Sequence, residues 1–172
     1  MYGTNSGPNG LPAIAFNESG QRLTTASVAS VPQMTIFVVY EMTSNVAWGT
    51  LIEQSHDTFF SIRSEAVSND NMSFHIVNNN AAPLIPEVLN EWNIIVAVQS
   101  STATSVYYPG SFSATTTQGP IAPGSSPISI GNASVSGLPA GGFVGEIRAY
   151  NSALSVAEQE IILADLHSKW GI

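Results

Sequence analysis

The chain has 172 residues, of which 44% are hydrophobic and 9% are charged, and this length and composition suit one compact domain rather than two. Twelve acidic residues against four basic residues give a formal net charge of −8, so the positive charge needed to bind nucleic acid or an anionic membrane is missing. The absence of cysteine excludes disulfide bonds, a thiolate nucleophile and cysteine-ligated metal centres.

Residues 1–10 contain three glycines, one proline and two asparagines, and this composition predicts a flexible N-terminal arm. The segment has neither a basic start nor an apolar run, so we expect no secretory signal in it. Apolar periodicity begins at Leu11. We therefore expect a single domain over residues 11–172.

Nine segments of this domain alternate apolar and polar residues or are rich in β-branched and aromatic residues, which favours strands over helices. Turn-forming residues separate several of them, as at 68–71 and at Pro109-Gly110, which predicts antiparallel pairing of neighbouring strands. The predicted strands are 11–16, 34–42, 48–53, 58–64, 72–77, 92–98, 105–108, 127–131 and 143–150. Residues 78–86 are predicted as a loop, and residues 111–126 as a long surface loop with at most one edge strand.

The C-terminal segment predicts the only helix. Ser155 with Glu158 three residues later is a capping-box pattern, and Gly171 supplies a stop. Apolar residues recur at helical spacing between them, at Val156, Ile162, Leu163, Leu166 and Trp170. Many short strands followed by one helix predict an all-β sandwich with an appended C-terminal helix.

The last forty residues carry the strongest pattern. A short strand ends in Ile130-Gly131, a Phe143-x-Gly145-x-Ile147 strand leads to Tyr150-Asn151, and Leu154-Ser155 opens the helix. This block resembles the laminin-G/pentraxin-like branch of the concanavalin A-like lectin/glucanase superfamily, and the upstream strands follow that family's order over about residues 11–170. The resemblance implies a concanavalin A-like antiparallel β-sandwich, or jelly roll.

Strand alternation gives the Phe143-x-Gly145-x-Ile147 pattern a physical meaning. Odd-numbered residues of a regular strand share one face, so we expect Phe143 and Ile147 to enter the core, with Gly145 leaving room for a neighbouring side chain. At the hairpin where members of the family often carry Tyr-Val-Asp/Asn-Gly, this chain has Tyr107-Tyr108-Pro109-Gly110. That difference removes one side-chain oxygen from the position of a calcium ligand.

The sequence lacks the motifs of the enzyme classes that this fold and other common folds support. Glucanases of the superfamily need carboxylates at Glu-x-Asp-x-x-Glu spacing, and no glutamate here has an aspartate two positions on. Gly-x-Ser-x-Gly, His-Glu-x-x-His and phosphate-binding loops are also absent. We therefore expect a protein without enzymatic activity.

Binding candidates are exposed aromatic side chains with polar neighbours. Trp48, Tyr107 and Tyr108 are the aromatic candidates for a carbohydrate site. His56 with Asp57 would orient a ligand or form a weak metal site. The alternatives are that the three aromatic residues pack internally and that His56 and Asp57 form a polar turn. Tyr107 and Tyr108 are adjacent, so on a regular strand they face opposite sides.

One loop carries the oxygen ligands that calcium prefers. Asn69, Asp70 and Asn71 place one carboxylate and two amides close together. A hairpin turn explains the same residues equally, because they tolerate left-handed backbone conformations. We expect no cofactor, with calcium at this loop as the alternative.

Two classes of function remain open from the sequence. The first is a non-enzymatic structural and adhesive module on a virion surface, such as a bacteriophage capsid decoration, tail or fibre protein assembled in the host cytoplasm. It fits the low charge, the lack of cysteine and the serine-, threonine- and asparagine-rich composition. The second is an extracellular carbohydrate-binding lectin domain of a secreted or adhesion protein; a glycoside hydrolase ranks last. The expected partners are virion proteins or cell-surface glycans and further copies of the chain, without nucleic acid or membrane insertion.

Overall fold

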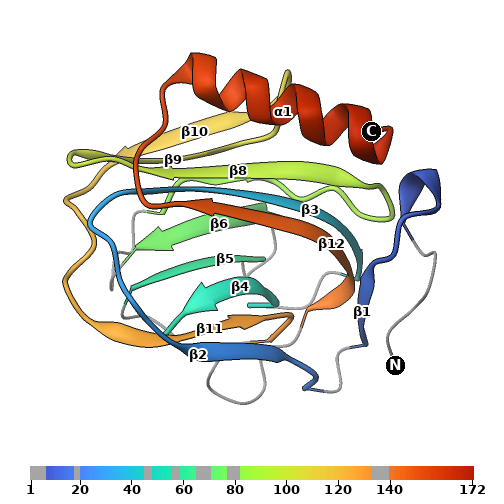
Figure 1. Ribbon diagram of the computed structural model, residues 1–172, viewed down its shortest axis with the longest axis horizontal. Helices are drawn as coiled ribbons and strands as arrows, with labels where there is room; N and C mark the ends of the chain where they lie inside the picture. The colour runs from blue at the N-terminus through green and yellow to red at the C-terminus, as the bar shows by residue number, and fades with distance from the viewer. Residues whose placement is uncertain are drawn as a thin grey trace.

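The computed structural model of the chain describes residues 7–17, 20–44, 48–55, 59–64, 71–76, 82–132 and 140–172. Within these ranges, twelve strands form two six-stranded antiparallel sheets that pack face to face, and one α-helix covers the outer face of one sheet (Figure 1). This architecture confirms the predicted all-β sandwich with one C-terminal helix. No helix in the described ranges is long and apolar enough to cross a membrane.

The two sheets have six strands each. Sheet A contains, in spatial order, β1 (Ile14–Asn17), β12 (Gly141–Tyr150), β3 (Met34–Ser44), β8 (Asn93–Gln99), β9 (Ala103–Tyr107) and β10 (Ser113–Thr117). Sheet B contains β2 (Leu23–Ala29), β11 (Ser125–Ile130), β4 (Thr50–Gln54), β5 (Phe60–Ser64), β6 (Asn71–Ile76) and β7 (Leu84–Pro86). The predicted meander of neighbouring antiparallel strands is present as β4, β5 and β6.

The helix α1 (Val156–Trp170) begins and ends as its sequence predicts. The Ser155 side chain accepts a hydrogen bond from the Glu158 backbone N–H, and the Glu158 side chain accepts one from the Ser155 backbone N–H, which completes the capping box. Gly171 ends the helix in the left-handed conformation, with φ at 70°. The buried face of α1 includes Leu163, Leu166 and Trp170 and lies on sheet A.

The central strand β3 explains why its sequence is a nearly continuous apolar run. Ile36, Val38 and Tyr40 point between the two sheets, whereas Phe37 and Val39 point toward α1. Each of these side chains is at most 1% exposed. A strand that is buried on both faces cannot alternate with polar residues, and β3 therefore connects the main core to the helix-side core.

A β-bulge changes the expected orientation of the Phe143-x-Gly145-x-Ile147 segment. The register of β12 against β3 shifts between residues 144 and 146, so Gly145 is the extra residue of the bulge. Val144 and Ile147 both pack in the core between the sheets, whereas Phe143 packs beside Trp92, with ring centroids 6.2 Å apart. The prediction that Phe143 and Ile147 share a face is wrong, because the bulge reverses the alternation between them.

The prediction that Gly145 leaves room for a neighbour is confirmed, and the neighbour is Trp170 of α1. A Cβ atom at Gly145 would lie 2.4 Å from the Trp170 ring. The Trp170 indole stacks on Trp92, with centroids 5.7 Å apart and planes 15° apart. Its Nε1 donates a 2.8 Å hydrogen bond to Glu146, so the end of α1 is fixed to β12 by both packing and polar contacts.

A cluster of charges joins α1 to β12 around Glu146. Its carboxylate oxygens lie 2.8 Å from Arg148 Nε and 2.9 Å from Lys169 Nζ, and Arg148 also contacts Asp165 at 2.6 Å. Burial by itself would raise the pKa of Glu146, but hydrogen bonds from Lys169, Trp170 and Arg148 outweigh it and lower the pKa to about 2. Glu146 is therefore ionised at neutral pH.

Other segments differ from their predicted structures. The predicted loop 78–86 ends in β7, a three-residue edge strand paired with β6, and β2 pairs with β11 although most of its residues are exposed. Both strands escaped prediction because cross-strand pairing, not apolar alternation, forms them. Of the expected flexible arm over residues 1–10, residues 7–10 are described. Pro8–Gly10 form a 3₁₀ turn, and Asn9 Nδ2 donates a 3.1 Å hydrogen bond to the Lys169 carbonyl at the end of α1.

Candidate functional site

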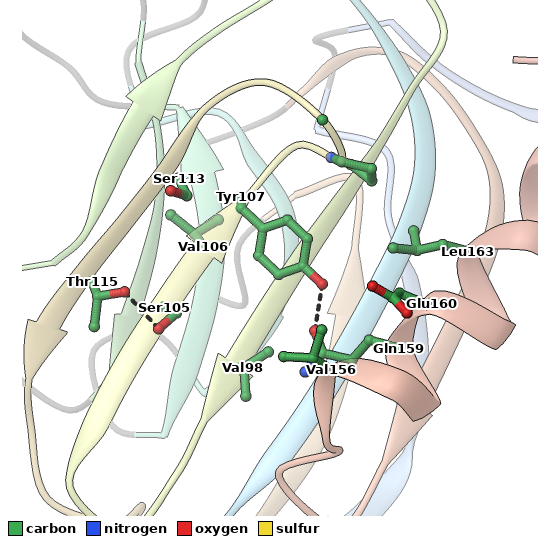
Figure 2. Close-up of a pocket in the computed structure, with 12 residues that line it drawn as sticks. Val98, Ser105, Val106, Tyr107, Ser113, Thr115, Val156, Gln159, Glu160 and Leu163 are labelled. Atoms are coloured by element: carbon green, nitrogen blue, oxygen red, sulfur yellow. Dashed lines mark hydrogen bonds between the residues drawn. The ribbon is translucent and has the colours of Figure 1, made fainter.

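A groove lies between the first half of α1 and the outer face of the β9–β10 hairpin (Figure 2). Its volume is about 520 Å³, which is within the range of about 300–1,000 Å³ typical of small-molecule sites. Apolar side chains of Val98, Pro109, Val156 and Leu163 form part of its lining. The polar side chains that line it are Ser105, Tyr107, Ser113, Thr115, Gln159 and Glu160.

Strand alternation places the hydroxyl groups on the groove side of the hairpin. Val106 and Ala114 face the core, so their neighbours Ser105, Tyr107 and Thr115 face outward. Ser105 lies opposite Thr115 across the two strands, and their hydroxyl oxygens are 2.8 Å apart. The hairpin thus presents a polar, uncharged wall to a ligand.

Tyr107 is the central side chain of the groove. Figure 2 shows its hydroxyl directed toward α1, where it donates a hydrogen bond to Gln159 Oε1. Burial, with a contribution from the Glu160 carboxylate, raises the pKa of Tyr107 from 10 to about 12. The phenol is therefore neutral at physiological pH, and its ring is held in one position by the helix.

Contacts from β3 hold the start of α1 above this groove. Thr35 donates a 2.9 Å hydrogen bond to the Ser152 carbonyl and accepts one of 2.9 Å from the Leu154 backbone N–H. Gln159 Nε2 donates to the Leu154 carbonyl at 2.7 Å, which orients the amide that receives the Tyr107 hydroxyl. The helix side of the groove is thus set by the fully buried Thr35.

The groove combines one carboxylate with neutral polar and apolar side chains. Among its described lining residues, Glu160 is the only carboxylate, and none is histidine, lysine or arginine. Glycosidic bond cleavage ordinarily needs two carboxylates that flank the bond. An aromatic ring with apolar neighbours, hydroxyls, an amide and one carboxylate is suited to holding a polar molecule that has apolar faces.

The structure separates the three aromatic candidates. Tyr108 faces the core, 5% exposed, and its hydroxyl oxygen lies 2.7 Å from that of Tyr40; burial raises the pKa of Tyr108 to about 12. Trp48 belongs to the β3–β4 connection, where the Arg63 guanidinium lies 4.5 Å from its ring centroid. Only Tyr107 of the three lines the groove.

The remaining sequence candidates are in different situations. His56, Asp57, Asn69 and Asp70 lie outside the described residues. Asn71 is described and begins β6, opposite Pro86 of β7. In the described part of the chain, no group of three or more histidine, aspartate or glutamate side chains is placed to hold a metal ion.

A second polar cluster lies on the face of sheet B that points away from the core. Glu53 lies opposite Ser61, which in turn lies opposite His75, and Arg63 lies opposite Ser73. Arg63 Nη2 is 3.4 Å from His75 Nδ1. Glu53 is fully buried and Arg63 is 6% exposed, so these charged side chains are enclosed in the structure and do not line the open groove.

The sequence did not indicate Ser105, Thr115, Gln159 and Glu160 as site residues. The helical pattern predicted α1, but it contained no signal for the part of the sandwich that α1 covers. Gln159 and Tyr107 are 52 positions apart and meet only because α1 packs across β8 and β9.

Comparison with known proteins agrees with this architecture. The profile of the concanavalin A-like lectin/glucanases superfamily matches residues 17–158. The chain belongs to this superfamily. A search of curated proteins gives no match.

Solved structures of the same fold come from several proteins. The SAP-like pentraxin of Limulus polyphemus, a native heptamer, is 15% identical with a TM-score of 0.63, over 84% of this chain and 77% of that chain. Domains LG4-5 of mouse laminin α1 are 17% identical with a TM-score of 0.63, over 84% of this chain and 44% of the laminin chain. The CBM40 of the Ruminococcus gnavus IT-sialidase is 16% identical with a TM-score of 0.61, over 81% of this chain and 97% of that chain. At these identities the likeness establishes the fold alone.

Proposed function

We propose that the protein is a non-enzymatic glycan-binding module whose ligand occupies the Tyr107 groove. The observation that carries the proposal is the Tyr107 side chain, held by Gln159 in a groove of about 520 Å³ whose opposite wall carries hydroxyl groups. Sugars combine apolar C–H faces with many hydroxyls, so they match a site with an aromatic ring, apolar side chains and neutral hydrogen-bonding groups.

The fold supports this proposal independently of the groove. The Ruminococcus gnavus CBM40 has been solved bound to α2,3 sialyllactose and shares the fold with a TM-score of 0.62. That ligand belongs to the neighbour. Because function depends on the site rather than the fold, the assignment to this chain needs a direct binding experiment.

A glycan array probed with the purified chain tests the proposal. The expected result is binding that is lost in Tyr107→Ala, since the ring and its hydroxyl are the centre of the groove. Phe112→Ala is the matched control, because Phe112 is a 49% exposed aromatic residue of the same hairpin that does not line the groove. Trp48→Ala tests the aromatic residue beside Arg63. An array without any hit, or a hit unaffected by Tyr107→Ala, would refute the assignment.

The proposed module neither cleaves glycans nor requires a metal ion to bind them. Support comes from the single carboxylate among the described lining residues of the groove. Incubation with laminarin, agar and alginate should release no reducing ends. The array should give the same hits with calcium and with a chelator; hits that vanish with the chelator would instead direct attention to Asp70 in the 68–71 segment.

We propose further that the module acts on the outside of a particle or cell, with a bacteriophage virion as the first candidate and a secreted adhesion protein as the second. The low content of charged residues, 9% of the chain, and the absence of cysteine support a surface module assembled in a reducing cytoplasm. Mass spectrometry of purified virions from the phage or host that encodes the chain tests whether the chain is a virion component. Absence of the chain from such particles would favour the adhesion protein.

A further inference from the structure

The groove carries a charge pattern that narrows the class of glycan. We infer that the Tyr107 groove selects uncharged glycans and rejects those that carry carboxylate or sulfate groups. This inference rests on the proposed function, because it specifies the ligand of the same site. It departs from the sialylated ligand of the structural neighbour CBM40, and it follows from the side chains that line the groove.

The first observation is the position of Glu160. Its side chain lines the groove together with the Tyr107 side chain (Figure 2). The carboxylate also contributes to the raised pKa of Tyr107, so its field reaches the phenol oxygen. An anionic group of a ligand that contacts Tyr107 would therefore be repelled by the Glu160 carboxylate.

The second observation is the location of the cations. None of the described residues that line the groove is basic. Arg148 and Lys169 lie on the other flank of α1, where they contact Asp165 and Glu146. Arg63 lies in sheet B beside Trp48. Recognition of a carboxylate or sulfate ordinarily relies on an arginine or lysine at the site, and the described lining of this groove supplies neither.

The chain as a whole adds to this preference. Its formal net charge of −8 produces a negative potential that slows the approach of polyanionic ligands, particularly at low ionic strength. Neutral hydroxyl and amide groups remain as the hydrogen-bonding partners in the groove. The side chains of Ser105, Thr115 and Gln159 can each donate and accept hydrogen bonds, which suits the hydroxyl groups of an uncharged sugar.

The test compares neutral and anionic oligosaccharides on the full chain by isothermal titration calorimetry. Laminari-oligosaccharides against alginate oligosaccharides, and lactose against sialyllactose, serve as the probes. We expect the neutral member to bind at least about ten-fold more tightly at low salt. In Glu160→Gln the ratio should fall to within about three-fold, because one charge of the groove is removed.

Glu91→Gln is the matched control for net charge. Glu91 is exposed and precedes β8, and Val98 of the groove lies seven residues further along the chain, about 20 Å away for an extended strand. This variant carries the same net charge as Glu160→Gln and should keep the ten-fold preference.

The outcomes separate the two proposals. An anionic oligosaccharide that binds as tightly as its neutral counterpart, with binding lost in Tyr107→Ala, overturns the inference and leaves the proposed function standing. A ratio that Glu160→Gln and Glu91→Gln reduce equally also overturns it, because the effect then belongs to net charge. Absence of all glycan binding, or binding that survives Tyr107→Ala, overturns both proposals.

Discussion

The contact between α1 and β12 depends on the charge of Glu146, and Glu146→Gln tests that dependence. The substitution keeps the size of the side chain and one acceptor oxygen but removes the negative charge. The Glu146 carboxylate accepts hydrogen bonds from Arg148 Nε at 2.8 Å, Lys169 Nζ at 2.9 Å and Trp170 Nε1 at 2.8 Å. All three contacts should weaken together in the variant.

The expected loss follows from the pKa of Glu146. Its value of about 2 against an ordinary 4.5 is a difference of about 2.5 pH units, which corresponds to about 3 kcal/mol. Lys169 is 47% exposed and Arg148 is 24% exposed, so solvent screens both partners. We therefore expect Glu146→Gln to lower the free energy of unfolding by about 1–2 kcal/mol at pH 7.

The pH dependence gives the result a distinct signature. A pKa that is lower in the folded state stabilises the protein above the unfolded pKa, and this stabilisation is lost as the pH falls from 4.5 to about 2. The difference between wild type and Glu146→Gln should therefore shrink toward zero over this interval. Comparison of the two proteins at each pH cancels the titration of the other carboxylates.

Urea denaturation followed by tryptophan fluorescence measures the loss of stability at pH 7 and its change with pH. Trp170 reports on unfolding because it is 2% exposed and lies at the contact between α1 and β12. Glu91→Gln, which removes an exposed charge, should unfold like the wild type at pH 7 and at pH 2.5. The reasoning would be refuted by a variant that is as stable as the wild type at pH 7. It would also be refuted by a destabilisation that is the same at pH 7 and at pH 2.5.

Three further predictions concern α1 and the groove. Gly145→Ala should lower stability by about 1–3 kcal/mol and alter the near-ultraviolet circular dichroism, because a Cβ atom would lie 2.4 Å from the Trp170 ring; an unchanged spectrum would contradict this. Ser155→Ala should lower the free energy of unfolding by about 1 kcal/mol in urea titrations, because the acceptor for the Glu158 backbone N–H is lost. Ser152→Ala is the control, since the Ser152 backbone carbonyl that accepts from Thr35 is kept. The difference between the absorbance titrations of the wild type and Tyr107→Phe should show a phenol that ionises near pH 12. The stabilisation that the neutral Tyr107 phenol contributes should be complete below pH 10 and decline above pH 10. Ionisation near pH 10 would contradict the burial of Tyr107.

The sequence was informative where one structural element contains its own signal. The two-sided burial of β3 appears as an unbroken apolar run that includes Ile36–Tyr40, and the helix start appears as the pair Ser155 and Glu158. The superfamily followed from the block at the C-terminus, where Gly145 leaves space for another side chain. These features were readable because residues close in the chain determine strand alternation, helix periodicity and capping.

The candidate site could be predicted only in part, because its residues come from elements that are far apart in the chain. Alternation required Tyr107 and Tyr108 to face opposite sides, but the choice between core and groove was made by packing, which pairs the Tyr108 hydroxyl with Tyr40. The bulge at Gly145 places Phe143 and Ile147 on opposite faces of β12. The space at Gly145 is filled by the Trp170 ring, which belongs to a distant element.

The amino-acid sequence by itself determined the strands other than β2 and β7, the capped helix, the scarcity of basic residues and the superfamily. The tertiary structure alone decided that α1 lies across β8 and β9, and this placement brings Gln159 and Glu160 to Tyr107. Local patterns specify which face of an element is apolar, but not which other apolar face it covers. That choice depends on shape and on hydrogen bonds between residues far apart in the chain, such as those from Thr35 to the start of α1.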